Sequence, residues 1–67
     1  MYIIVFHDGD MTNAYAGSTY VCKGERCTSL DNDNPKLYKT EGLAERSAKR
    51  LIASCTNVTA KYEIIEK

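Results

Sequence analysis

Long apolar runs are absent from this chain, and no stretch approaches the roughly 20 residues that a membrane-spanning helix needs. The first residues, MYIIVFHDG, also lack the basic segment and the small-residue cleavage site of a secretory signal peptide. These absences argue against both a membrane protein and a secreted one. We therefore expect a protein of the cytosol.

Cysteines are few and odd in number. A small secreted scaffold held by disulfides normally carries an even set, whereas this chain has 3. Cys22 and Cys27 could face each other across a turn and form a disulfide on air oxidation, and Cys55 and His7 could complete a zinc site. The spacing between the first two is looser than in a usual zinc knuckle, and no C-x-x-C pair is present. Reduced thiols that pack as small apolar side chains are the simpler interpretation, and we predict no metal.

The chain also lacks any set of acid, base, nucleophile and metal ligand that converges by spacing. The stretch 8–12, DGDMT, resembles the first motif of the haloacid-dehalogenase-like phosphatases, in which one aspartate is a nucleophile and the next a general acid. Those enzymes need a complete doubly wound domain and further motifs, for which this chain is too short. We therefore predict no enzymatic activity, no catalytic residue and no cofactor.

A second partial motif is the stretch 31–34, DNDN, which begins like a calcium-binding loop. Pro35 and Lys36 follow where that loop requires a ligand and a glycine, and Gly42 replaces its closing glutamate. Ordinary turn residues are the better explanation of this stretch.

Size and composition favour one small globular domain over residues 1–67. A chain of 67 residues buries only about 60% of its unfolded surface, which is too little to divide between two cores. Apolar residues make up 43% of the chain, as in a folded protein rather than a disordered tail. We expect a monomer or a small homo-oligomer.

The charges are unevenly distributed, although the formal net charge is 0. Residues 1–35 carry five acidic and two basic side chains, whereas residues 36–67 carry four acidic and seven basic ones. The two parts have net charges of −3 and +3, so the molecule is expected to be a charge dipole.

One helix organises the expected fold. Within residues 40–55, TEGLAERSAKRLIASC, apolar and small residues recur at steps of three and four, while charged residues occupy mostly the opposite side. Thr40 is a suitable N-cap, and Glu41 lies where the helix dipole favours an anion. The stripe predicted to face the core consists of Leu43, Ala44, Ser47, Ala48, Leu51, Ile52 and Cys55.

Strands surround this helix in the sequence. Residues 2–7 form a continuous β-branched and aromatic run, typical of a central strand covered on both faces. Gly17 indicates a bulge in the second strand, and the alternation near the C-terminus is that of a half-buried strand. Strands are predicted at residues 2–7, 14–22, 27–30 and 58–65, with a short edge strand at 37–39. The order β-β-β-(β)-α-β predicts an α+β domain, in which one mostly antiparallel sheet has one helix packed on one face.

The connections determine where the acidic residues lie. Residues 8–13 are interpreted as a loop, with a tight hairpin turn at Asp8-Gly9 as the alternative. If the first three strands alternate in direction, this loop and the loop at 31–35 emerge at the same end of the sheet. A tight turn followed by an extra strand would instead place the two acidic loops at opposite ends.

Clustered carboxylates on a rigid scaffold can occupy a groove shaped for phosphates, because a partner's arginines cannot distinguish the two anions by charge alone. The simpler explanation is that turns are generally rich in Asp and Asn. The predicted partner-binding residues are Asp8, Asp10, Glu25, Asp31 and Asp33.

An alternative site lies on the charged side of the helix. Lys39, Arg46, Lys49 and Arg50 would form a basic face that can contact nucleic-acid phosphates. The simpler explanation is the solvation of a surface helix, with Glu45 and Lys49 as a supporting i,i+4 pair. Tyrosines on the sheet face away from the helix could add a stacking platform for single strands. These tyrosines are Tyr2, Tyr20, Tyr38 and Tyr62.

The organisation of the chain resembles that of small anti-CRISPR proteins of bacteriophages and mobile elements. An acid-bearing meander, YIIVFHDGD through CTSLDNDNP, is followed by one Ala-rich helix, GLAERSAKRLIA, and a closing strand, AKYEIIEK. The resemblance implies a non-enzymatic inhibitor in the cytoplasm of a bacterial host, which binds a CRISPR surveillance complex and blocks its access to DNA. Some members mimic the charge of DNA. A net charge of 0 is less acidic than in a typical DNA mimic, so any mimicry would be confined to the acidic loops.

Overall fold

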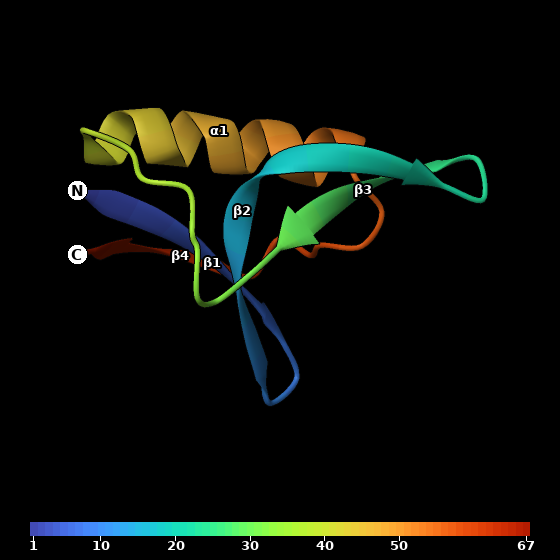
Figure 1. Ribbon diagram of the computed structural model, residues 1–67, viewed down its shortest axis with the longest axis horizontal. Helices are drawn as coiled ribbons and strands as arrows, with labels where there is room; N and C mark the ends of the chain where they lie inside the picture. The colour runs from blue at the N-terminus through green and yellow to red at the C-terminus, as the bar shows by residue number, and fades with distance from the viewer.

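The computed structural model describes residues 1–67 as one antiparallel sheet of four strands with one helix across it (Figure 1). The strands are β1 (Tyr2–Asp8), β2 (Met11–Cys22), β3 (Glu25–Leu30) and β4 (Tyr62–Glu66), and the helix α1 spans Glu41–Ser54. The strand order is β3-β2-β1-β4, which confirms the predicted small α+β fold. No helix has the length and apolar character required to cross a membrane.

Strand β1 lies inside the sheet, as its continuous apolar run predicts. It pairs with β2 on one side and with β4 on the other, so neither of its edges is free. Ile4 and Phe6 point into the cluster beneath α1, whereas Ile3 and Val5 pack with Ala14 on the opposite face. All four of these β1 side chains are buried.

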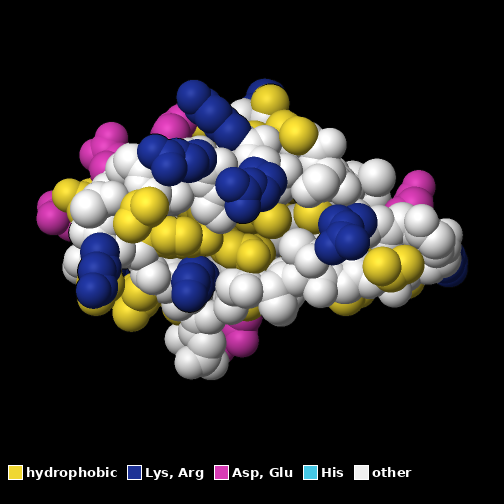
Figure 2. Space-filling view, turned by 90° about the horizontal axis from the view of Figure 1, so that it is seen from above, with side chains coloured by type: hydrophobic (Ala, Val, Ile, Leu, Met, Phe, Trp, Pro, Cys, Tyr) yellow, Lys and Arg dark blue, Asp and Glu magenta, His cyan; other side chains and the backbone are white.

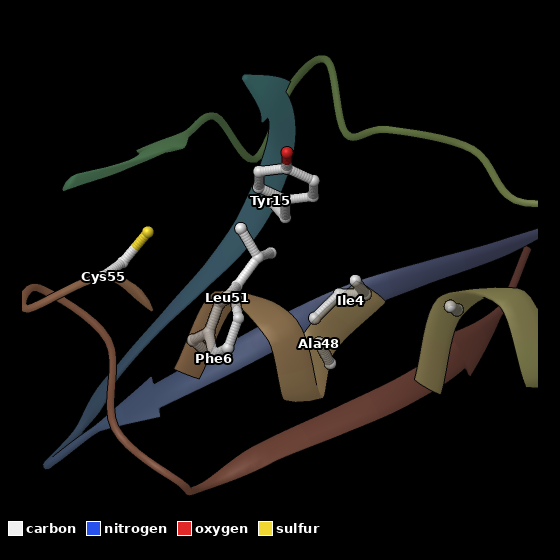
Figure 3. Packing of buried hydrophobic residues seen from close by; sticks show 7 residues of the cluster. Ile4, Phe6, Tyr15, Ala48, Leu51 and Cys55 are labelled. Carbon is white, nitrogen blue, oxygen red and sulfur yellow. The ribbon is translucent and has the colours of Figure 1, made fainter. Parts of the chain in front are cut away.

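Helix α1 begins where the sequence predicts. The hydroxyl oxygen of Thr40 accepts a hydrogen bond from the backbone N–H of Leu43 at 3.2 Å, which satisfies one free donor of the first turn. The outward side carries the charged residues (Figure 2), and the inward side packs on the sheet (Figure 3). Ala44 and Ala48 are fully buried because their small side chains allow the helix backbone to approach the sheet closely.

The core differs from the predicted helix stripe at its first residue. Leu43 is 48% exposed and does not belong to the core, because the first half of α1 packs on the sheet through Ala44 and Ala48 instead. Ile52 is only half-buried at the border of the core. The buried cluster consists of Ile4, Phe6, Tyr15, Ala44, Ala48, Leu51 and Cys55.

The interpretation of residues 8–13 as a loop is wrong, since β2 begins at Met11. Asp8 pairs with Met11, and the turn between them consists of Gly9 and Asp10. Gly9 has φ +62°, a conformation that glycine adopts without strain. The tight hairpin is therefore the correct alternative. No extra strand follows it, however, because residues 11–13 simply lengthen β2.

Strand β2 serves two partners along its length. Its first part pairs with β1 and its second part with β3, and the register shifts between Tyr15 and Thr19. Gly17, with φ +104°, lies in this irregular stretch, as predicted for a bulge. The β2–β3 hairpin consequently projects away from the rest of the sheet as an arm (Figure 1).

Two connections are more irregular than predicted. The expected edge strand at 37–39 is reduced to a single bridge between Tyr38 and Tyr2, whose backbones exchange two hydrogen bonds of 2.8 Å. The last strand begins at Tyr62 rather than at Val58. Thr56 and Asn57 bond to β3, and the backbone bonds to β1 only from Lys61 onward.

The outer edge of β3 is closed by the segment after α1. Oδ1 of Asn57 accepts a hydrogen bond from the backbone N–H of Thr28 at 2.7 Å, and Nδ2 of Asn57 donates one to the backbone oxygen of Thr28 at 2.9 Å. The backbone N–H of Thr56 donates to the oxygen of Arg26 at 3.0 Å. This segment therefore satisfies edge groups of β3 that would otherwise be free.

Tyr62 connects β4 to α1, because its hydroxyl donates a hydrogen bond to Oε1 of Glu45. This hydrogen bond raises the pKa of Tyr62 above its ordinary value of 10.0, and burial and the charge of Glu45 act in the same direction. The interaction therefore stabilises the fold fully below pH 10.0, and this contribution is lost as the pH rises through the raised pKa of Tyr62.

We expect the Glu45→Ala variant to have a Tyr62 pKa closer to 10.0, because both the acceptor and its negative charge are removed. An NMR titration of the tyrosine ring signals measures this shift directly. Arg46→Ala is the control, since Arg46 is exposed and makes no hydrogen bond to Tyr62. An unchanged Tyr62 pKa in the Glu45→Ala variant would contradict the assignment.

Candidate interaction surfaces

The structure has no pocket that could enclose a small molecule. No three His, Cys, Asp or Glu side chains are grouped so that they could hold a metal ion together. The candidate sites are therefore the exposed acidic and basic surfaces that the sequence predicts.

The acidic loop after β3 is fixed to β2 by an asparagine side chain. Oδ1 of Asn32 accepts a hydrogen bond from the backbone N–H of Ala14 at 2.8 Å, and Nδ2 of Asn32 donates one to the oxygen of Thr12 at 3.1 Å. The amide takes the place of a neighbouring strand along the part of β2 that lies beyond β3. Asp31 and Asp33, on either side of Asn32, are exposed.

Three further hydrogen bonds hold the backbone of this loop. The N–H of Asp31 donates to the oxygen of Ala14 at 2.9 Å, and the N–H of Lys36 donates to the oxygen of Tyr15 at 2.7 Å. Within the loop, the N–H of Asp33 donates to Oδ1 of Asp31 at 2.9 Å, as in an Asx turn. The two carboxylates are thus attached to a loop whose backbone is restrained at both ends.

The β1–β2 turn carries the other two predicted aspartates to the same end of the sheet. Asn32 binds the backbone of Thr12. Thr12 and Asp10 are two residues apart, a separation of roughly 7 Å along an extended strand. Asp8 and Asp10 are both exposed. We refer to Asp8, Asp10, Asp31 and Asp33 together as the acidic end. No basic side chain forms an ion pair with any of them, because the one ion pair of the structure joins His7 to Glu63.

Glu25 does not lie at the acidic end. It is the first residue of β3, directly opposite Cys22 and next to the turn formed by Lys23 and Gly24. Its Oε2 accepts a long hydrogen bond of 3.5 Å from the hydroxyl of Thr56. Glu25 therefore belongs to the tip of the projecting β2–β3 arm, far along β2 from the β1–β2 turn.

The basic residues of α1 form a continuous exposed stripe. Lys49 and Arg50 lie three and four residues after Arg46, which places them beside it on the helix surface, and all three are exposed. The expected i,i+4 pair between Glu45 and Lys49 does not form, because Glu45 binds the hydroxyl of Tyr62 instead. Lys39 is also exposed and immediately precedes the N-cap.

The view onto α1 shows how these charges are arranged. Lys and Arg side chains gather around an apolar strip on this face, and Asp and Glu side chains lie at its margins (Figure 2). The acidic end belongs to the β1–β2 turn and the loop after β3, whereas the basic side chains of α1 are outside the sheet. The four aspartates of the acidic end and the basic stripe of α1 therefore lie on different elements of the fold.

The predicted tyrosine platform is wrong, because three of its four members lie on the helix side of the sheet. The hydroxyls of Tyr38 and Tyr62 bind Ser47 and Glu45 of α1, and Tyr2 packs against the buried cluster. Tyr20 alone is far from the helix, at 51% exposure on the β2–β3 arm. A row of tyrosines for base stacking is thus not formed.

The four candidate zinc ligands are not brought together. Cys22 pairs with Glu25 and Cys27 pairs with Tyr20, so the two thiols are diagonal neighbours rather than opposite each other, and both are free. Cys55 is buried at the end of α1. Nε2 of His7 lies 3.0 Å from Oε1 of Glu63 on the next strand.

The two other partial motifs also lie in structures unlike those of their families. The stretch 8–12 forms a hairpin rather than the carboxyl end of a parallel strand. In the stretch 31–34, the amide of Asn32 is occupied by the backbone of β2 and cannot point at a cation.

Sequence reasoning missed the two asparagines that replace neighbouring strands, Asn32 and Asn57. Each sits among turn-forming residues, where asparagine is common for local reasons. Their partners are 18 to 20 and 29 residues away in the sequence, so no local spacing reveals them. Covariation between each asparagine and its distant partners in an alignment of homologues is the signal that could have identified them.

No protein-family model, no characterised protein and no solved structure matches this chain. A functional proposal for the protein therefore depends on its own residues and their geometry.

Proposed function

We propose that this protein binds a basic surface of another protein through its acidic end and so inhibits that partner without catalysis. The partner is a nucleic-acid-binding complex of a bacterial host, since a groove that binds phosphates presents the arginine and lysine side chains that carboxylates also bind. The resemblance in organisation to anti-CRISPR proteins points to a CRISPR surveillance complex as this partner.

The fixed acidic loop is the observation that supports this proposal. Asn32, together with the backbone of Asp31 and Lys36, restrains the loop through hydrogen bonds to β2. A restrained loop loses little conformational entropy on binding, so more of its charge attraction appears as affinity.

Free carboxylates are the second requirement for binding a basic groove. The four side chains of the acidic end make no ion pair within the chain. They therefore need not break an internal ion pair before they contact a partner. Repulsion between them disfavours the free protein and is relieved when a basic partner binds. Glu25, at the tip of the other hairpin, is expected to contribute less because it lies apart from this group.

Charge reversal tests the proposal. We expect Asp31→Lys with Asp33→Lys to abolish binding to a partner that the wild-type protein captures from bacterial lysate, identified by mass spectrometry. The attraction to a basic groove is replaced by repulsion, while the Asn32 hydrogen bonds remain available. Arg46→Glu with Arg50→Glu is the matched control and should leave this binding intact.

A milder pair of variants separates charge from loop structure. Asp31→Asn with Asp33→Asn removes two charges but keeps an acceptor for the N–H of residue 33. We expect this double variant to weaken binding by about tenfold or more at low salt, and less at high salt, where screening already reduces the attraction. Binding that is unaffected by both double variants would exclude the acidic end as the contact surface.

A second candidate function is nucleic-acid binding by α1, and one observation favours it. Arg46, Lys49 and Arg50 form no ion pair, so their charges are available to phosphates. Fluorescence anisotropy with labelled oligonucleotides should then show binding that weakens with salt. The logarithm of the association constant should fall linearly with the logarithm of the salt concentration, with a slope of about 0.9 per contacted phosphate. Arg46→Glu with Arg50→Glu should abolish this binding, and the reversed aspartates should not.

A further inference from the structure

The two outer edges of the sheet differ in whether another segment of the chain covers them. Asn57 and Thr56 close the edge of β3, and Asn32 closes the first part of β2. Strand β4 is the other outermost strand, and it pairs only with β1 (Figures 1 and 3). An edge strand without a cover is a template for pairing with another strand.

The register of β4 identifies its free backbone groups. Met1 and Lys67 exchange hydrogen bonds in both directions, and the N–H of His7 donates to the oxygen of Lys61. Bonded and non-bonded positions alternate in an antiparallel ladder, so the odd-numbered residues of β4 bond to β1. The N–H and oxygen of the even-numbered residues point away from the sheet. These residues are Tyr62, Ile64 and Glu66.

We propose that the β4 edge binds the same edge of a second copy of this chain, which produces a twofold dimer with a continuous sheet. In the register centred on Ile65, Ile64 of each copy exchanges backbone hydrogen bonds with Glu66 of the other. Ile65 then faces Ile65 of the second copy on the sheet face away from α1. The two acidic ends point in opposite directions, so dimerisation leaves both free.

The charges of β4 are complementary to themselves in this register. Glu63 of one copy lies opposite Lys67 of the other, and the twofold axis repeats this pair on the other side of Ile65. Both residues are exposed and lie on the same face as Ile65. A register centred on Ile64 would instead place Lys61 opposite Lys67, and one centred on Glu63 would place this carboxylate opposite itself. Among these three registers, only the one centred on Ile65 pairs opposite charges, and this complementarity favours a second copy as the partner of this edge.

An exposed apolar row ends at the same edge. Ile65 is 36% exposed and pairs with the buried Ile3. The antiparallel bridge between Tyr2 and Tyr38 places Leu37, which is 51% exposed, on the other side of Ile3. Tyr38 binds the helix, so Leu37 lies on the opposite face with Ile65. The dimer would make this row continuous across both copies and cover Ile65.

Sedimentation velocity over a wide range of protein concentrations tests this proposal. The wild-type protein should change from monomer to dimer as the concentration rises. Glu66→Pro removes an N–H that points away from β1 and blocks the approach of a second strand, while the ladder within the chain is kept. This variant should remain monomeric with an unchanged far-ultraviolet circular dichroism spectrum. A wild-type protein that is monomeric throughout, or a Glu66→Pro variant that still dimerises, overturns the proposal.

A charge exchange tests the register and separates it from folding. Lys67→Glu alone places two carboxylates opposite each other at both ends of the pairing and should weaken the dimer by about tenfold or more. Adding Glu63→Lys restores opposite charges in the same positions and should recover the wild-type dissociation constant. The double variant also loses the contact between His7 and Glu63. Its thermal unfolding is therefore measured as well, to show that the variant is folded. A folded double variant that dimerises no better than Lys67→Glu overturns the register.

Discussion

Replacing Ile4 with alanine should destabilise the protein by about 2 to 5 kcal/mol, the range measured for deleting most of a buried aliphatic side chain. Ile4 has no exposed surface, and it lies in the middle of β1 among the residues of α1 that pack on the sheet (Figure 3). The cavity cannot be filled easily, because Ala44 and Ala48 bring the rigid helix backbone, rather than flexible side chains, against this position.

The consequence is large because the total stability of a small domain is small. For 67 residues, a free energy of unfolding of roughly 3 to 10 kcal/mol is typical. The Ile4→Ala variant should therefore be partly or fully unfolded at room temperature, as urea or thermal denaturation followed by circular dichroism can measure. If the variant is too unstable to study, Ile4→Val should show the same effect at about 0.5 to 1.5 kcal/mol.

Leu43→Ala is the control for this prediction. Leu43 is 48% exposed near the start of α1, and alanine is the better helix former. We expect its effect on the free energy of unfolding to lie within about 0.5 kcal/mol. The helical spacing of the sequence assigns Leu43 to the core together with Leu51. If Leu43→Ala lowered the free energy of unfolding as much as Ile4→Ala does, Leu43 would be a core residue, as the helical spacing predicts, and its exposed position would be wrong.

The elements that the sequence predicts well are those with a strong local pattern. Three predicted features each depend on neighbouring residues alone, namely the apolar run of β1, the helical stripe with its Thr40 cap and the bulge at Gly17. Burial then follows from the pattern, because a strand that is apolar on both faces must lie inside the sheet. These features fix the fold class and the central position of β1.

The errors occur where two local signals compete. Asp8-Gly9-Asp10 suits a tight turn or the start of a longer loop, and residues 11–13 have no alternation that would identify β2. The position of these residues is decided by pairing with β1, which supplies hydrogen bonds to a segment with little strand preference of its own. The late start of β4 at Tyr62 has a similar cause, since the preceding segment is held by β3 through Asn57.

The candidate acidic site was predictable in its residues and only partly in its arrangement. The aspartates of the two loops follow from turn composition, and their common end follows from the alternating strand directions. The Asn32 contacts that hold the loop cannot be read from the sequence, because they join residues that only the tertiary fold brings together. The turn at Lys23 and Gly24 is shorter than the predicted connection of residues 23–26, so Glu25 is the first residue of β3, next to the tip of the other hairpin.

Replacing Asn57 with alanine should cost about 2 to 4 kcal/mol, because one side chain satisfies both backbone groups of a buried residue. Thr28 is 1% exposed, and its N–H and oxygen both bind the Asn57 amide. Its hydroxyl oxygen has no hydrogen-bond partner, so this position already contains one unsatisfied polar atom. Asn34→Ala is the matched control, since Asn34 is exposed and should change the free energy of unfolding by less than about 0.5 kcal/mol.

Hydrogen exchange can separate the local effect of Asn57→Ala from general destabilisation. If Asn57 closes the edge of β3, the amide of Thr28 should lose more protection than the amides of β1, which lie inside the sheet. Equal losses throughout would mean that Asn57 acts only through global stability, and no loss would mean that water replaces the side chain. The variant would also have two open edges instead of one. If β4 pairs with a second copy, a newly opened β3 edge should extend dimers into larger assemblies at high concentration, because each copy would then carry two surfaces for strand pairing.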